Sequence, residues 1–169
     1  MKDKKLFGGI LVIMLLILVG CNDDSVQHER INLPIEAELP VYYAPYSDTA
    51  LIAESDIEFQ HESLTLNSNA EVEKCLSKRF LQAYPEYAKI DFSRYSLLVF
   101  TSIQPGDIVG RKTGYYKEVT SGRYFYSVRY LVDREEDREP SLYFERLGVV
   151  VKKLKPGVVV DCVRSCTYQ

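Results

Sequence analysis

The order of apolar and polar residues predicts a domain built mainly from β-strands. Residues 96–103 form a mostly apolar run that is typical of a central strand, and residues 123–132 alternate in the way of a half-buried strand. Further strands are expected at residues 41–43, 57–66, 115–119, 142–154 and 158–163. The turn sequence Lys155-Pro156-Gly157 separates the last two and predicts that they form a hairpin.

One main helix is expected at about residues 69–83. Ser68 and Glu71 have the spacing of a capping box at its start, and Pro85 disfavours helical backbone beyond Ala83. Apolar residues recur at helical spacing between these limits, at Val72, Cys75, Leu76 and Phe80. A helix followed by consecutive strands predicts the α+β class, with the helix packed on a mostly antiparallel sheet that is open or barrel-like.

The N-terminus has the layout of a secretory signal peptide. Residues 1–5 are basic, residues 6–18 are almost wholly apolar, and Leu18-Val19-Gly20-Cys21 resembles the lipobox of bacterial lipoproteins. The alternative is a membrane-spanning anchor, but the apolar stretch of about fifteen residues is shorter than the roughly twenty that spanning requires. The resemblance implies cleavage before Cys21 and diacylation of its thiol, which would anchor the protein to a membrane.

This interpretation divides the chain into a signal peptide at residues 1–20, a lipidated N-terminus and flexible tether at 21–38, and one globular domain at 39–169. The acidic run Asn22-Asp23-Asp24 resembles the tag that sends some Bacteroidetes lipoproteins to the cell surface. We therefore expect an outer-membrane lipoprotein that faces either the periplasm or the outside of the cell.

The charge of the mature chain argues against a nucleic-acid partner. Removing residues 1–20 takes away three lysines and one aspartate, so the net charge falls from −3 to −5. Binding to nucleic acid depends largely on basic contacts to phosphate, and the mature chain has no polybasic patch.

Three patterns resemble ligand sites but fail in detail. Residues 106–113 have the wrong spacing for a phosphate-binding loop and precede a strand rather than a helix. Residues 133–139 are rich in acids, but the positions where a calcium loop needs glycine and glutamate hold Arg138 and Phe144. His61 and the cysteines lack the usual spacing of zinc ligands. We therefore predict no metal, no cofactor and no catalytic residue.

The three cysteines that follow Cys21 allow one disulfide in an oxidising compartment. Cys162 and Cys166 are about 13 Å apart on a straight strand, which is too far to bridge. The candidate bond therefore joins Cys75 to Cys162 or to Cys166. In the alternative, all three are reduced and simply packed in the domain.

Tyrosine is abundant, with 13 residues in the chain, and three of them share one face of the strand at 123–132. A flat apolar ring with a polar tip suits contact with a sugar or a protein, which makes Tyr124, Tyr126 and Tyr130 candidate partner-binding aromatics. Because tyrosine is also a good strand residue, the alternative places these rings in the core or on an ordinary sheet surface.

From Ile90-Asp91-Phe92-Ser93-Arg94-Tyr95-Ser96-Leu97-Leu98 onward the chain resembles small lipoproteins of Bacteroidetes. These share such a phrase, a glycine-bearing loop (here residues 106–114), a tyrosine-rich strand (124–130) and two closing hydrophobic strands (149–163). A fainter similarity, in the strand, the glycine loop and Gly114-Tyr115, links the chain to the C-terminal domain of spirochaetal lipoproteins that stabilise a surface protease complex. Neither resemblance implies a catalytic residue.

These observations favour a non-enzymatic binding or accessory module of the cell envelope that recognises a protein or a glycan. Four features agree with this hypothesis: the lipobox-like signal peptide, the acidic single domain, the abundant tyrosines and the lack of a catalytic motif. Two alternatives stay open: an envelope hydrolase that uses paired carboxylates, and a purely structural lipoprotein.

Overall fold

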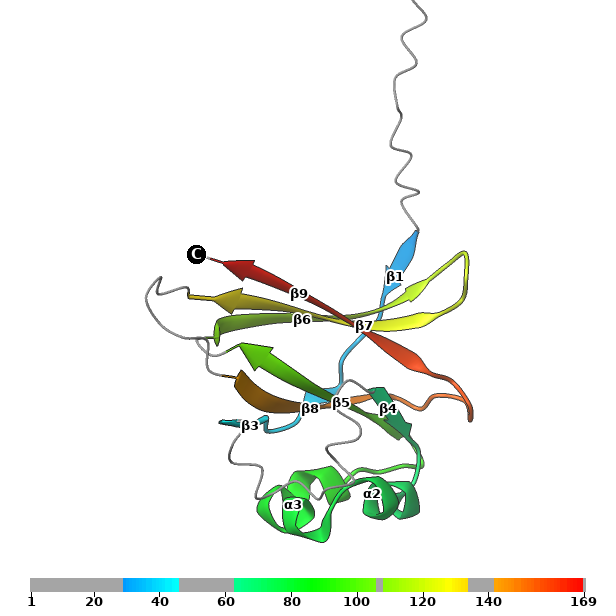
Figure 1. Ribbon diagram of the computed structural model, residues 1–169. Helices are drawn as coiled ribbons and strands as arrows, with labels where there is room; N and C mark the ends of the chain where they lie inside the picture. Colours follow the sequence, from blue (N-terminus) through cyan, green and yellow to red (C-terminus); the bar gives the residue numbers. More distant parts are fainter. Residues whose placement is uncertain (1–28, 46–62, 106–107, 134–141, 169) are drawn as a thin grey trace, which may run out of the picture.

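A computed structural model describes residues 29–45, 63–105, 108–133 and 142–168. These residues form three layers: a sheet of four strands (sheet A), a second sheet of five strands (sheet B), and a layer of short helices (Figure 1). The helices lie against sheet B only, which places sheet B in the middle of the molecule.

Sheet B is built around two long antiparallel strands. β5 (Tyr95–Pro105) pairs with β8 (Leu142–Lys152) along the full length of both strands. Shorter strands border this pair: β4 (Ser63–Leu66) beside β5, with β2 (Ala37–Glu38) and β3 (Tyr42–Pro45) beside β8. The mostly apolar sequence of β5 is explained by its position, because both of its faces are covered.

Sheet A has the strand order β1-β6-β7-β9. Its members are β1 (Arg30–Asn32), β6 (Ile108–Glu118), β7 (Tyr124–Val132) and β9 (Val160–Tyr168). β6 and β7 form an antiparallel hairpin, whereas β7 and β9 are parallel. β6 includes most of the stretch that the sequence predicted as a glycine-bearing loop.

The predicted hairpin between the last two strands is wrong. β8 lies in sheet B, and after the Lys155-Pro156-Gly157 turn the chain crosses to sheet A, where β9 pairs with β7. Gly157 has a φ of +79°, so the turn residues do reverse the chain. Val160 and Leu154 are buried between the sheets, and this burial favours the crossing over pairing with β8.

The single helix expected at 69–83 is also wrong, because two short helices occupy that segment. α2 (Asn69–Cys75) is capped by Ser68 as predicted: the Ser68 hydroxyl accepts from the Glu71 amide at 3.2 Å. α3 (Lys78–Ala83) has its own cap, since the Ser77 hydroxyl accepts from the Phe80 amide at 3.1 Å. Leu76 between them is extended, and a 3₁₀ turn, η1 (Pro85–Ala88), follows.

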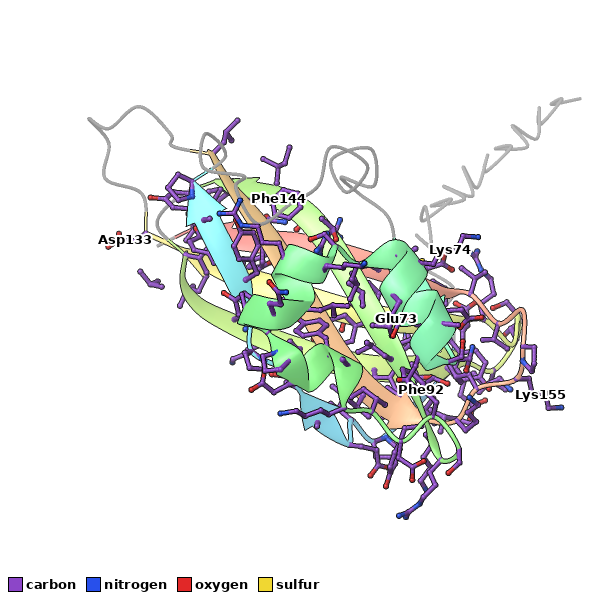
Figure 2. The ribbon with its side chains drawn as sticks, turned by 90° about the horizontal axis from the view of Figure 1, so that it is seen from below. Glu73, Lys74, Phe92, Asp133, Phe144 and Lys155 are labelled. Atoms are coloured by element: carbon purple, nitrogen blue, oxygen red, sulfur yellow. The ribbon has the colours of Figure 1, made fainter. Side chains whose placement is uncertain are left out.

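Two hydrophobic cores lie on the two faces of sheet B. Alternate residues of β5 and β8 point to each side, so that Leu98 and Val149 pack between the sheets while Leu97 and Phe144 pack under the helices. Figure 2, seen from the helix side, shows α2 and α3 lying across sheet B, with Asp133 and Lys155 near opposite ends of the sandwich.

Part of the predicted tether belongs to the domain. Residues 30–38 pass from the edge of sheet A to the edge of sheet B through β1 and β2. Between these strands the Leu33 amide donates to the Tyr115 carbonyl at 2.8 Å, and the Glu36 amide donates to the Val150 carbonyl at 2.9 Å. This segment therefore ties the two sheets together along one side.

The described part of the chain is thus mostly β with two short α-helices, and its two sheets are not closed into a barrel. Among the described residues, no helix is long and apolar enough to cross a membrane. Cys21, His61 and the acidic run at 134–139 lie outside the described residues.

Candidate binding site

The predicted tyrosine face of β7 points into the molecule, not toward a partner. Tyr126 is 1% exposed and Tyr130 is 0% exposed, and Tyr126 stacks on Phe100 of sheet B with ring centroids 4.6 Å apart. Tyr124 is half-buried and packs against the same core. The prediction that these three tyrosines bind a partner is therefore wrong. Alternation correctly identified that they share a face of the strand, but that face lies between the two sheets.

The predicted disulfide is not formed either. Cys75 packs in the core under the helices, whereas Cys162 packs in the core between the sheets, so sheet B separates them. Cys162 and Cys166 carry free thiols. Burial raises the pKa of the Cys162 thiol above its usual range, which makes it a poor nucleophile at neutral pH.

The outer face of sheet A is the one large sheet surface that no described element covers (Figure 1). Strand pairing brings two aromatic rings together near one end of this face: Tyr116 of β6 and Phe125 of β7 stack with centroids 5.3 Å apart. The Arg30 guanidinium lies 4.7 Å from the centre of the Tyr116 ring. Arg123 lies over Phe125 and pairs with Asp161 at 2.7 Å, so its charge is neutralised.

The middle of this face carries a pair of like charges. Lys112 of β6 and Arg129 of β7 are direct cross-strand partners, and both are exposed. Within the described residues, neither has a carboxylate at salt-bridge distance. Like charges directly opposite each other destabilise an antiparallel pair, so this arrangement costs the fold some stability.

Two neighbouring depressions share this cation pair. One, of about 360 Å³, is lined by residues that include Gly110, Leu131 and Thr167. The other, of about 330 Å³, is lined by Arg30, Tyr116 and the hydroxyl residues Ser127 and Ser165, among others. Lys112 and Arg129 line both, and we call the combined surface the sheet A trough.

Two small residues form the cross-strand pair next to the two cations, with Gly114 of β6 opposite Ser127 of β7. A Cβ atom at Gly114 would lie 3.0 Å from the Ser127 hydroxyl, a contact that only glycine avoids without a shift. The Ser127 hydroxyl donates to the Gly114 carbonyl at 3.3 Å, which is a weak hydrogen bond. The floor therefore presents short polar side chains beside the two longer cations.

A buried polar network supports the end of the trough nearest Asp133. Glu145 of β8 is 2% exposed, and its carboxylate accepts from Arg111 at 2.8 Å and from the Tyr130 hydroxyl. Burial raises the pKa of Tyr130 far above its usual range, and the adjacent Glu145 charge raises it further, so Tyr130 remains a hydrogen-bond donor. Nearby, the Gln104 amide donates to the Ser102 hydroxyl at 2.9 Å.

This network joins the two sheets and fixes Arg111, whose side chain is 26% exposed and lines the larger depression. Both oxygens of Glu145 already accept hydrogen bonds, so the carboxylate is held as an anchor rather than presented as a base.

The hydrolase hypothesis required a cavity with two carboxylates. Among the described residues that line five cavities, no cavity has more than one acid. Among the described residues there is also no group of three or more side chains suited to hold a metal ion.

Comparison of the chain with protein-family models, with curated proteins and with solved structures gave no match.

The trough could not be predicted from the sequence because its cations are far apart in the chain. Arg30, Lys112 and Arg129 come from three strands, and the sequence around each is unremarkable. The usable signal was the polar face of the strand at 123–132, where Ser127 and Arg129 alternate with buried tyrosines.

Proposed function

We propose that this protein is a lipoprotein of the outer membrane, anchored through lipid on Cys21, and that it works as a non-enzymatic binding module. Its contact surface in this proposal is the sheet A trough. The observation that carries the proposal is the Lys112–Arg129 pair: two exposed like charges stand opposite each other in the shared part of two depressions, and no carboxylate of the described residues neutralises either. A bound partner of opposite charge would remove their repulsion.

The position of β1 supports a surface held near the membrane. If the lipid is on Cys21, eight residues separate it from the start of β1 at Arg30, and such a segment spans at most about 28 Å. Arg30 also lines the trough, so the binding surface and the anchor belong to the same side of the domain. The anchor would then confine the search for a partner to the neighbourhood of the bilayer.

Site-specific photocrosslinking in cells tests the surface. A photoreactive residue in place of Ser165, which is exposed in the trough, should give a discrete crosslinked product. The matched control is Glu73, exposed on α2 on the opposite side of the molecule (Figure 2), which should give none. If neither position captures a partner under several growth conditions, a purely structural lipoprotein is the better account.

Metabolic labelling separately tests whether Cys21 carries the lipid anchor. A fatty-acid analogue of palmitate should label the wild-type protein, and Cys21→Ser should abolish the label. An unlabelled wild-type protein would refute the lipid anchor without bearing on the trough.

A further inference from the structure

The charge pattern of the trough points to a linear partner with repeated negative charges. Lys112 and Tyr116 are four positions apart on β6, which corresponds to about 13 Å along the strand. The Arg30 guanidinium lies over the Tyr116 ring, so the positive groups of Lys112 and Arg30 are at two separate places along the trough. Both line the same depression, together with Arg129. A single small anion reaches one of these positive groups, whereas a chain that carries several acids reaches both.

The backbone beneath the trough argues against a peptide as this partner. Peptides that bind sheets usually do so by main-chain hydrogen bonding at an open strand edge, or through deep side-chain pockets. Lys112 and Arg129 are cross-strand partners within the β6–β7 ladder, so a ligand that contacts both lies over the face of the sheet rather than along a strand edge. What the floor offers instead is hydroxyl groups, from Ser127, Ser165 and Thr167.

Hydroxyl groups beside arginine and lysine match the surface of an acidic sugar polymer. Such a polymer presents its own hydroxyls to the serines and threonine, and its carboxylates to the cations. We propose that the sheet A trough binds a linear glycan that carries carboxylate groups. This inference rests on the proposed function and specifies its partner.

Calorimetric titration of the full-length protein in a nonionic detergent tests the assignment with three probes. An oligogalacturonate should bind, a neutral malto-oligosaccharide of the same length should not, and an oligoglutamate of the same charge should bind more weakly than the oligogalacturonate. Because the contacts are exposed and ionic, raising the salt concentration should weaken binding to the oligogalacturonate.

Charge substitutions locate the site. Lys112→Gln and Arg129→Gln should each reduce affinity for the oligogalacturonate about two- to fivefold, which is the range expected for one exposed ion pair. Lys155→Gln, an exposed lysine beyond the end of β8 (Figure 2), should leave it unchanged. Removing either trough cation also relieves the repulsion between them, so these two variants should melt no lower than the wild type.

Several results would overturn the inference: equal binding of the neutral glycan, tighter binding of the oligoglutamate, or an equal loss in Lys155→Gln. If the oligogalacturonate fails to bind but the Ser165 crosslink captures a partner, the binding function stands and the acidic glycan is wrong. If both experiments fail, the trough is not a binding surface.

Discussion

The contact between Gly148 and Tyr87 gives the sharpest test of how the helical layer is held on sheet B. Gly148 lies on β8 under the ring of Tyr87, which is 0% exposed. A Cβ atom at position 148 would lie 2.5 Å from Cε1, 2.6 Å from Cζ and 2.7 Å from the hydroxyl oxygen of this ring. Ordinary carbon contacts are about 3.5–4.0 Å, so Gly148→Ala forces the ring to move by about 1 Å.

The cost of that movement can be worked out from the surroundings of Tyr87. Overpacking a filled core costs about 1–3 kcal/mol. The Tyr87 hydroxyl also donates to the Pro40 carbonyl at 3.1 Å, and losing this partly buried hydrogen bond costs about 1–3 kcal/mol more. Replacing glycine restores about 0.4–1 kcal/mol by restricting the unfolded chain. We expect Gly148→Ala to lower the free energy of unfolding by about 3 kcal/mol.

Urea denaturation followed by circular dichroism measures this loss. The matched control is Gly110→Ala, whose Cβ would meet Leu131 at 3.5 Å, an ordinary contact, and whose effect should be within about 0.5 kcal/mol. Adding Tyr87→Leu removes the ring, so the double variant should lose clearly less than the sum of the two single losses. Additive losses, or a Gly148→Ala variant as stable as the wild type, would refute this packing.

Three further predictions concern stability and can use the same denaturation assay. Tyr130→Phe removes a donor to the buried Glu145 carboxylate and should cost about 1.5–3 kcal/mol, against less than about 0.5 kcal/mol for Tyr124→Phe; equal losses would contradict the network. Ser77→Ala removes the cap that accepts from the Phe80 amide and should cost about 1 kcal/mol, whereas no loss would mean that the break between the helices has another cause. Burial raises the pKa of four tyrosines, so the folded state keeps protons that the unfolded chain loses above pH about 10. Stability should therefore be intact below that pH and fall as the pH rises above it, and a flat profile to pH 11 would contradict their burial. The four are Tyr87, Tyr115, Tyr126 and Tyr130.

Local signals in the sequence were reliable where the local chain decides the structure. The alternation at 123–132 correctly placed Tyr126 and Tyr130 on one face of a strand, and Ser68 caps a helix as its spacing predicted. The break at Ser77 was missed because apolar residues keep their helical spacing across it. A second capping serine overrides that spacing, since its hydroxyl offers the chain a new helix start.

Signals that depend on distant parts of the chain were not reliable. Turn residues predicted that the chain reverses after Lys155, but they carry no information on which strand β9 will join. Similarly, alternation along β7 cannot say which of its faces is covered, because that depends on sheet B. The trough was beyond reach for the same reason: its positive groups come from strands that the fold, and not the sequence, makes neighbours.

The cations of sheet A fall into two groups: those paired with a carboxylate of the fold and those left exposed to solvent. Arg111 is held by the buried Glu145, and Arg123 is held by Asp161, so both are neutralised within the fold. Lys112 and Arg129 lie between these pairs and are left facing each other, in a chain whose overall charge is negative. Folding gains nothing from that repulsion, because one glutamate opposite either cation would turn it into an attraction. In the function proposed above, a negatively charged partner would offset the repulsion of this pair, and the paired arginines beside it would fix the frame in which that partner binds.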